Sequence, residues 1–307
     1  MSDDYISREK TIKYLEYICK ILTARGGRTA ADILRNKGIK VVADKISIPA
    51  ANVVELPATG IGDLSDGYLE PFFGSGAVLF TKSRSPIETV NDLDGDVVNL
   101  FDWIKRDPER LADAIHWTPY SREVYDRAID AYKAGVDDSF ERAIVFCTNL
   151  MMGHGFRTNE IKVGWKNDVQ GREAAYAAKG WCDTPQRIKE AAERLRGVQI
   201  ENRPALEVIT RFNYPNVLIY ADPPYLLGTR HGKQYACEMT DADHADLLDA
   251  LKNHSGPVLL SGYESPLYRE ALKDWHREEI DVRAQTATKR REILWMNFEP
   301  AGQMKIF

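Results

Sequence analysis

Short apolar runs alternate with amphipathic stretches along most of this 307-residue chain, starting near residue 67. An apolar run, a turn and a helical pattern follow one another in 67–80 and again in 86–108. The alternation resumes in 197–209 and 216–225 and continues through 241–275. Because strand and helix patterns in regular alternation are typical of open, mostly parallel sheets with helices on both faces, the sequence predicts an α/β fold.

Two regions depart from this alternation. Residues 104–197 are mostly helical and polar, with breaks at 151–160 and 162–171, so they predict a long helical insertion that splits the sheet. The end of the chain holds two extended runs, 276–286 and 291–300, joined by a polar turn, and this pattern predicts an antiparallel hairpin.

The beginning of the chain predicts an atypical helical segment. Ser7 is placed to cap a helix whose apolar stripe runs through 12–22. Two further helical pieces, 29–39 and 48–56, fit either a helix-turn-helix or, more commonly, two packed helices around a glycine. The predicted division is an N-terminal segment of 1–66, a sheet domain of 67–103 and 198–307, and an inserted domain of 104–197.

Composition narrows the class of protein. The hydrophobic content of 44% and charged content of 28% are ordinary for a soluble globular protein. The chain has no apolar stretch long enough to cross a membrane and a polar start unlike a signal peptide, so we expect a cytosolic protein. The four cysteines lie far apart, which favours reduced thiols over a disulfide framework or a zinc site, and no metal site is predicted.

Charge alone does not indicate a partner. The formal net charge is −5, which is not typical of a nucleic-acid-binding protein. Residues 156–196 carry nine Lys or Arg against six Asp or Glu. This mild excess is more often a solvated helical face than a binding site.

A glycine-rich turn follows the first predicted strand. Gly74 and Gly76 allow the backbone to turn tightly and to come close to a bound molecule, although such a pair is also common in plain turns. The next strand ends at Asp92, which is placed either to accept hydrogen bonds from ribose hydroxyls or to cap the following helix. A nicotinamide-binding turn is not indicated, because Leu79 stands where its third glycine would be.

The stretch "ADPPYLLGTR" (221–230) ends an apolar strand abruptly. Two prolines cannot continue a strand, so Asp222 is presented at the carboxyl edge of the sheet with a rigid turn behind it. Its carboxylate and the Pro223 carbonyl form a pair of acceptors suited to an amino group, and the Tyr225 ring offers a flat face for a planar base.

These segments resemble the Dam-like (class alpha) adenine-specific DNA methyltransferases, especially the phage and prophage type. "YLEPFFGSGAVLF" is similar to the first cofactor motif of that family, "VNDLDGDVVNLF" to the second, and "YADPPY" to the catalytic motif. "TPYSREVYDRA", "GVQIENRPALEVI", "LSGYESPLY" and "EILWMN" also resemble segments of these enzymes in the same order. The resemblance covers roughly residues 67–300.

The resemblance implies a seven-stranded, Rossmann-like sheet that binds S-adenosylmethionine and methylates the N6 amino group of an adenine flipped out of the duplex. The residues it implies for the cofactor are Glu70, Pro71, Phe72, Gly74, Gly76 and Asp92, with Asp222 at the edge of the same site. The residues it implies for catalysis are Asp222, Pro223, Pro224 and Tyr225.

Two features depart from the family pattern. The family usually has a Gly-Gly-Lys turn just before the first cofactor motif, but residues 44–66 contain none, and the nearest analogue, at 26–28, lies far upstream. Many relatives also carry an acid where this chain has Pro204. Backbone groups near Asn202 and Arg203 are the expected substitute in contacting the cofactor.

Double-stranded DNA is the expected partner, in the cytoplasm of a bacterial or phage-infected cell and in contact with the nucleoid. The sequence leaves open whether the protein acts alone or beside a restriction enzyme. Basic, amide and aromatic side chains in the insertion and after the catalytic turn suit phosphates, base edges and the gap left by a flipped base. These candidates are Arg122, Arg157, Asn159, Lys162, Trp165, Lys166, Arg172, Arg230, His231 and Lys233. Two alternatives stay open: a methyltransferase for an exocyclic nitrogen in RNA, and a DNA- or cofactor-binding protein with little catalysis.

Overall fold

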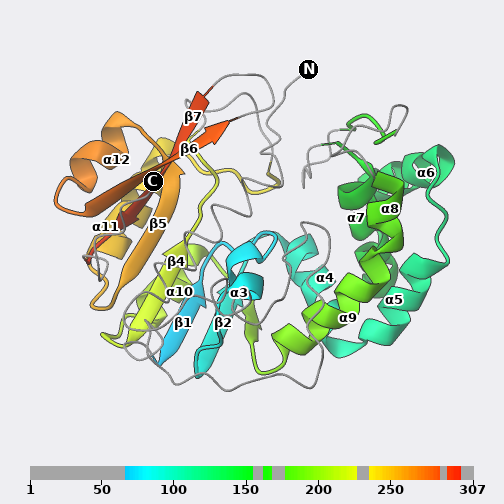
Figure 1. Ribbon diagram of the computed structural model, residues 1–307, viewed down its shortest axis with the longest axis horizontal. Coiled ribbons are helices and arrows are strands. Elements are labelled where there is room, and N and C mark those ends of the chain that lie inside the picture. The colour runs from blue at the N-terminus through cyan, green and yellow to red at the C-terminus, as the bar shows by residue number, and fades with distance from the viewer. Residues whose placement is uncertain (1–65, 155–161, 168–176, 227–234, 284–288, 299–307) are drawn as a thin grey trace, which may run out of the picture.

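The computed structural model describes residues 66–154, 162–167, 177–226, 235–283 and 289–298. Seven strands form one sheet in the order β3-β2-β1-β4-β5-β7-β6 (Figure 1). The strands are β1 (Gly67–Glu70), β2 (Ile87–Asn91), β3 (Gln199–Glu201), β4 (Val217–Ala221), β5 (Val258–Tyr263), β6 (His276–Arg283) and β7 (Lys289–Met296). The predicted α/β fold and its seven-stranded sheet are confirmed. The N-terminal helix capped by Ser7 and the pieces at 29–56 lie outside the described residues.

The first five strands are parallel and the last two form the predicted hairpin. β1 pairs in parallel with β2 and β4, β2 with β3, and β4 with β5. β7 lies antiparallel between β5 and β6. The carboxyl ends of β1, β2, β4 and β5 therefore meet at one edge of the sheet, where open parallel sheets bind their ligands.

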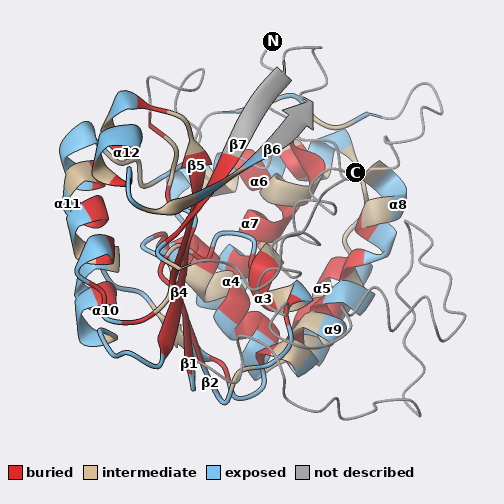
Figure 2. Cartoon of the chain, turned by 60° about the vertical axis from the view of Figure 1, so that its left-hand side comes forward, coloured by how far each residue is buried: buried red, intermediate tan, exposed pale blue. Residues whose placement is uncertain are grey.

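Helices cover both faces of the sheet, as Figure 2 shows, with α10, α11 and α12 on one side and α3 to α9 on the other. Polar side chains begin most of them: Asp94, Asp107, Ser121, Asp138, Thr240 and Ser265 each accept a hydrogen bond from the first turn of the helix that follows. The helices are α3 (Ala77–Thr81), α4 (Gly95–Arg106), α5 (Pro108–His116), α6 (Arg122–Ala134), α7 (Ser139–Met152), α8 (Ala177–Cys182), α9 (Thr184–Leu195), α10 (Ala205–Arg211), α11 (Asp241–Lys252) and α12 (Pro266–Ala271). None of the helices in the described ranges is long and apolar enough to cross a membrane.

Side chains from both faces of the sheet are buried, which explains the near-continuous apolar runs of the parallel strands. On β1, Tyr68 packs into the core beneath α4, α5, α7 and α9, while Leu69 packs into the core beneath α10, α11 and α12. The first of these cores runs without interruption from the sheet through the helical insertion. The boundary expected at residue 104 falls inside α4, which ends at Arg106.

A buried ion network joins the end of the insertion to the sheet. Glu88 of β2 is 3% exposed and accepts two hydrogen bonds from Arg194 of α9, at 2.6 and 2.8 Å, and one from Lys82 at 2.5 Å. Burial by itself raises the pKa of Glu88, but the hydrogen bonds and charges of Arg194 and Lys82 outweigh it, so the pKa is lowered. Arg84 adds bonds to the carbonyls of Glu193 and Arg196, at 2.7 and 2.8 Å.

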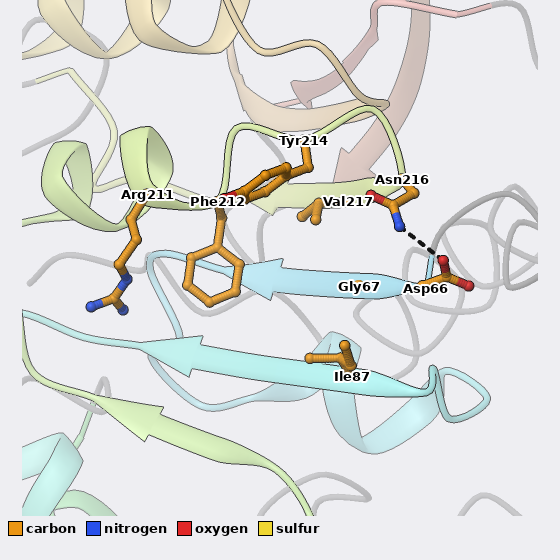
Figure 3. Close-up of a pocket in the computed structure, with 8 residues that line it drawn as sticks. All are labelled: Asp66, Gly67, Ile87, Arg211, Phe212, Tyr214, Asn216 and Val217. Carbon is orange, nitrogen blue, oxygen red and sulfur yellow. Dashed lines mark hydrogen bonds between the residues drawn. The ribbon is translucent and has the colours of Figure 1, made fainter.

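A hollow of about 350 Å³ lies beside the amino ends of β1, β2 and β4 (Figure 3). It is therefore at the opposite end of these strands from the carboxyl edge described above. Its lining is largely apolar, with Ile87 and Tyr214 exposed by 48% and 59%, and Asn216 closes one side through a 2.8 Å bond to Asp66. Because ligands of open parallel sheets bind at the carboxyl ends of the strands, this hollow is separate from the candidate active site.

Candidate active site

The glycine-rich turn after β1 needs both of its glycines, for different reasons. Gly74 and Gly76 have φ angles of +50° and +67°, a region that favours glycine. A Cβ atom on Gly76 would lie 2.5 Å from the Phe73 ring and 2.7 Å from Phe80, so packing also excludes a side chain there. A Cβ atom on Gly74 would meet nothing within 4 Å. The backbone at Gly74 is thus open to a ligand.

Asp92 ties the glycine turn to the loop after β2. Its carboxylate accepts a 2.7 Å bond from the Gly74 amide and a 2.9 Å bond from the Asp94 amide. Removal from water raises the pKa of the Asp92 carboxyl, although backbone hydrogen bonds act in the opposite direction. The side chain that caps α4 is Asp94 and not Asp92, so the helix-cap interpretation of Asp92 is wrong. Asp92 instead faces the glycine turn.

Asn91, which sequence reasoning missed, joins the ends of three strands. The side chain is 1% exposed and donates to the carbonyls of Pro71 and Arg203, at 2.9 and 3.0 Å, while its oxygen accepts from the Arg203 amide at 2.9 Å. Its own carbonyl accepts from the Phe73 amide at 2.8 Å. The sequence signal for Asn91 was its position: it is a polar amide at the end of a predicted strand, directly before Asp92.

Asn202, which follows β3, holds the backbone of the loop after β2. Its amide donates to the carbonyls of Asp92 and Leu93, at 2.7 and 3.2 Å. Next to it, Pro204 stands at the N-cap of α10 without a side-chain cap bond. Leu93, in the same loop, is 52% exposed, and sequence reasoning had not selected it.

The remaining residues of the first cofactor motif are mostly buried. Pro71 is buried, and Phe72 is half-buried against the core of β4 and α11. Glu70, at the end of β1, is 2% exposed and accepts a hydrogen bond from the Tyr68 hydroxyl. Burial raises the pKa of Glu70 to about 8; the nearby Asp222 charge adds to this shift, and Lys82 opposes it.

The Asp222 carboxylate stands where β4 ends. Asp222 is exposed as a residue, and partial removal of its carboxyl group from water raises its pKa. Hydrogen bonds from the Ser261 hydroxyl, at 2.9 Å, and from Tyr225 act in the opposite direction. Pro223 is buried and Pro224 half-buried, so the turn behind the carboxylate is held by packing as well as by its two rings.

Two tyrosine rings lie beside this carboxylate. The rings of Tyr225 and Tyr263 have centroids 4.4 Å apart and planes inclined by 59°. Tyr263 ends β5, and sequence reasoning gave no role to it or to Ser261, although "LSGYESPLY" was noted. Their signal was the placement of a hydroxyl and an aromatic ring two positions apart at the carboxyl end of an apolar strand.

The structure brings four of the candidate DNA-binding residues together beside α6 and α7. The Arg122 guanidinium lies 4.9 Å from the centre of the Trp165 ring, and Lys162 forms a 2.8 Å ion pair with Asp126. Lys166 is engaged differently, because its ammonium donates to the Met151 carbonyl at 3.1 Å. Burial lowers the pKa of Lys166 to about 8. The other candidates lie outside the described residues: Arg157, Asn159, Arg172, Arg230, His231 and Lys233.

Comparisons with known proteins agree with this architecture. Residues 55–288 match the family described as the D12 class N6 adenine-specific DNA methyltransferases. The chain is also 25% identical, over 229 residues, to Type II methyltransferase M1.LlaDCHI of Lactococcus lactis subsp. cremoris, a match that covers 70% of this chain and 78% of the relative.

Because the family match spans most of the chain, the protein belongs to the D12 class N6 adenine-specific DNA methyltransferases. It is an enzyme that acts on DNA adenine, and its reaction requires a methyl donor. The Dam-like interpretation is confirmed, and the family favours DNA over RNA as the substrate.

Proposed function

We propose that the chain transfers the methyl group of S-adenosylmethionine to the N6 amino group of an adenine flipped out of duplex DNA. The observation that carries the proposal is the placement of Asp222 and Tyr225 at the carboxyl end of β4, beside the strand that leads into the open glycine turn. S-adenosylmethionine supplies a methyl group on a sulfonium sulfur, which makes that carbon electrophilic.

The residues between β1 and β3 fit this cofactor. The open backbone at Gly74 admits a ligand, and the Asp92 carboxylate retains lone pairs for two ribose hydroxyls besides the two amides it already accepts from. The exposed Leu93 side chain offers an apolar surface to the adenine ring of the cofactor. Asn202 holds the Leu93 backbone in place, which supports its assignment to the cofactor site.

The catalytic turn fits the target amino group. The Asp222 carboxylate and the Pro223 carbonyl accept its two hydrogens, which orients the nitrogen lone pair and increases its electron density. As the lone pair forms the new bond to carbon, the carbon–sulfur bond breaks and its electrons stay on sulfur. The nitrogen then loses one proton to solvent or to the Asp222 carboxylate. Preorganised acceptors and positioning supply much of such catalysis.

The flipped base would stack on Tyr225, because a base inside a duplex is out of reach of the turn. Pro224 keeps the Tyr225 backbone rigid. In the insertion, Arg122 and Lys162 are the exposed cations assigned to phosphates, with Trp165 beside them. The candidates outside the described residues remain in the proposal: Arg157, Asn159, Arg172, Arg230, His231 and Lys233.

The relative's name suggests a cellular setting. M1.LlaDCHI is a Type II methyltransferase, so we place this chain beside a restriction enzyme that cuts the same unmethylated site, in a bacterial or phage-infected cytoplasm. A bacterial genome sequenced with base-modification detection, with and without the protein, will give the methylated sequence.

The decisive experiment compares Asp222→Ala with the wild type in single-turnover methylation of duplex DNA, with N6-methyladenine measured by mass spectrometry. Loss of a preorganised acceptor should lower the rate at least about a hundredfold, roughly 3 kcal/mol. Cofactor affinity and thermal stability should change little. Asp246→Ala, which removes an exposed carboxylate on α11, is the matched control. An Asp222→Ala enzyme with most of its turnover would refute the assignment. A wild type that binds S-adenosylmethionine without methylating DNA would favour a binding protein.

A further inference from the structure

The carboxyl end of β5 supports the catalytic turn through two side chains. Ser261 and Tyr263 are two positions apart, so they lie on the same face of the strand. The Ser261 hydroxyl, fully buried, donates to Asp222 Oδ1 at 2.9 Å, and the Tyr263 ring packs on Tyr225 at 4.4 Å. Gly262 faces the other way, because a Cβ atom there would meet Trp295 and Tyr268.

The hydrogen bond from Ser261 fixes a rotation that the backbone leaves free. The final torsion of an aspartate side chain is broad and has no sharp preferred angle. The prolines fix the main chain at Asp222 but not the plane of its carboxylate. A buried donor on the neighbouring strand restricts that plane: Ser261 holds one oxygen from β5, while Tyr225 donates to the carboxylate from the same turn.

The packing of Tyr263 has a parallel effect on the neighbouring ring. The two rings, with planes inclined by 59°, pack in a tilted arrangement, and this close contact restricts the tilt of each. The face of Tyr225 is therefore oriented by a residue on β5 and not by the catalytic turn alone.

We propose that Ser261 is a positioning residue for methyl transfer, which sets the plane of the Asp222 carboxylate, and that Tyr263 sets the plane of the Tyr225 ring. The end of β5 thereby determines the geometry of both groups that hold the target base. The inference rests on the proposed roles of Asp222 and Tyr225, and it adds two residues to the machinery for which no role had been assigned.

Other groups near Asp222 bear on how this role is measured. Among the described residues these are Glu70 on β1, Tyr225 in the same turn, and Tyr268 on α12, whose pKa is raised chiefly by burial and also by the Asp222 charge. The hydrogen bond from Ser261 stabilises the ionised carboxylate and so lowers its pKa. Removal of that bond therefore raises the pKa of Asp222.

The test is a set of three variants measured in single-turnover methylation. Ser261→Ala and the near-isosteric Ser261→Cys remove the strong donor, while Ser261→Thr keeps a hydroxyl. We expect the first two to lower the rate of methyl transfer by 10- to 100-fold and Ser261→Thr to retain most of it. KM for DNA and affinity for S-adenosylmethionine should stay within about threefold. The acid limb of the rate–pH profile should move to higher pH, because the lost hydrogen bond stabilised the ionised carboxylate.

Two controls separate positioning from structure. Ser255→Ala removes a comparable hydroxyl bond, 2.6 Å to Asn213, at the other end of β5, and should leave the rate unchanged. In an Asp222→Ala background, which lacks the acceptor, Ser261→Ala should have little further effect on the residual rate, because the serine acts through the carboxylate. For the ring pair, Tyr263→Ala should lower the rate about tenfold, whereas Tyr263→Phe, which keeps the ring, should lower it clearly less.

The outcomes distinguish this inference from the proposed function. Wild-type rates and pH profiles for Ser261→Ala and Ser261→Cys, beside an inactive Asp222→Ala, would overturn the inference and leave the function standing. A slow Ser261→Ala enzyme with an unmoved pH profile and a lowered melting temperature would also overturn it, because only a structural role would remain. An active Asp222→Ala enzyme would refute the proposed function itself.

Discussion

The two halves of the candidate site are held together by different kinds of contact. Between β1 and β3, side chains bind the backbone: Asn91 and Asp92 hold the loops of neighbouring strands by their amides and carbonyls. Between β4 and β5, side chains bind side chains, as in the pairs Asp222–Ser261 and Tyr225–Tyr263. The first half, which we call the cradle, is the set of loops after β1, β2 and β3, and its contacts fix the backbone of the expected cofactor site. The contacts of the second half fix the orientation of the side chains of the catalytic turn. Substitutions should therefore affect folding and cofactor affinity in the first half, and rate in the second.

The largest change in the free energy of unfolding is expected at Glu70. This residue ends β1, the strand that lies between the two halves of the site. Folding raises its pKa from 4.5 to about 8, so its contribution to stability is complete below pH 4.5 and is lost as pH rises through 8. The neutral Glu70→Gln protein should lack this loss and gain about 3–5 kcal/mol over the wild type between pH 4.5 and 9. Urea unfolding at several pH values measures it. Glu270→Gln, an exposed change on α12, should follow the wild type; a shared pH slope for all three proteins would contradict the prediction.

A slightly smaller effect on stability is expected from Asn91→Ala in the cradle. The change leaves the Pro71 and Arg203 carbonyls and the Arg203 amide without their partner. We expect a loss of about 2–4 kcal/mol in the free energy of unfolding, together with weaker cofactor binding. Asn202→Ala, at an exposed position in the same loop, should cost clearly less stability. Equal effects of the two variants in chemical unfolding would show that burial of Asn91 does not matter.

Asp92→Ala sharpens the contrast by separating affinity from rate. Loss of charged acceptors for the ribose hydroxyls should weaken S-adenosylmethionine binding by about 1.5–3 kcal/mol. The methylation rate at saturating cofactor should fall much less than in Asp222→Ala. Calorimetry measures the affinity, and Asp107→Ala, which removes the cap of α5, is the control that perturbs a helix without touching the cradle. Unchanged affinity in Asp92→Ala would remove this residue from the cofactor site.

The smallest effects are expected in the insertion, where Lys162 and Lys166 are four positions apart. If the exposed Lys162 contacts a phosphate, Lys162→Ala should reduce the slope of log affinity against log salt by about 0.9 on duplex DNA. Lys166→Met should leave that slope unchanged and lower stability, because the Lys166 ammonium caps the end of α7. A reduced slope for Lys166→Met alone would reverse the two roles.

The fold was largely predictable because each strand carries its own signal. Residues 67–69 and 217–221 are apolar because both faces of the sheet are covered, and the prolines after Ala221 fix where β4 ends. The terminal hairpin was also predicted, although its place between β5 and the sheet edge depends on pairing that local pattern does not encode.

The site was predictable at Gly74, Asp92 and Asp222. Each has a residue type suited to binding or catalysis, and each lies in a segment that follows a predicted strand. Ser261 and Asn91 were missed because their roles depend on contacts with residues 39 and 112 positions away along the chain. Lys166 shows another limit: its DNA-binding role stays a prediction, and the bond of its ammonium to the end of α7 is a contact that the local pattern does not encode.

The ion network around Glu88 has a consequence for engineering new specificities. Recognition segments are natural units to exchange between relatives, and the predicted recognition insertion, residues 104–197, is the segment that such an exchange would move. Such a chimera would remove Arg194 and leave Glu88 buried with Lys82 as its cationic partner. Breaking a buried pair in this way costs about 3–5 kcal/mol, on top of a core divided between two parents. A transplant should therefore carry Arg194 in the incoming segment, or replace Glu88 and Arg194 together with apolar residues of similar volume.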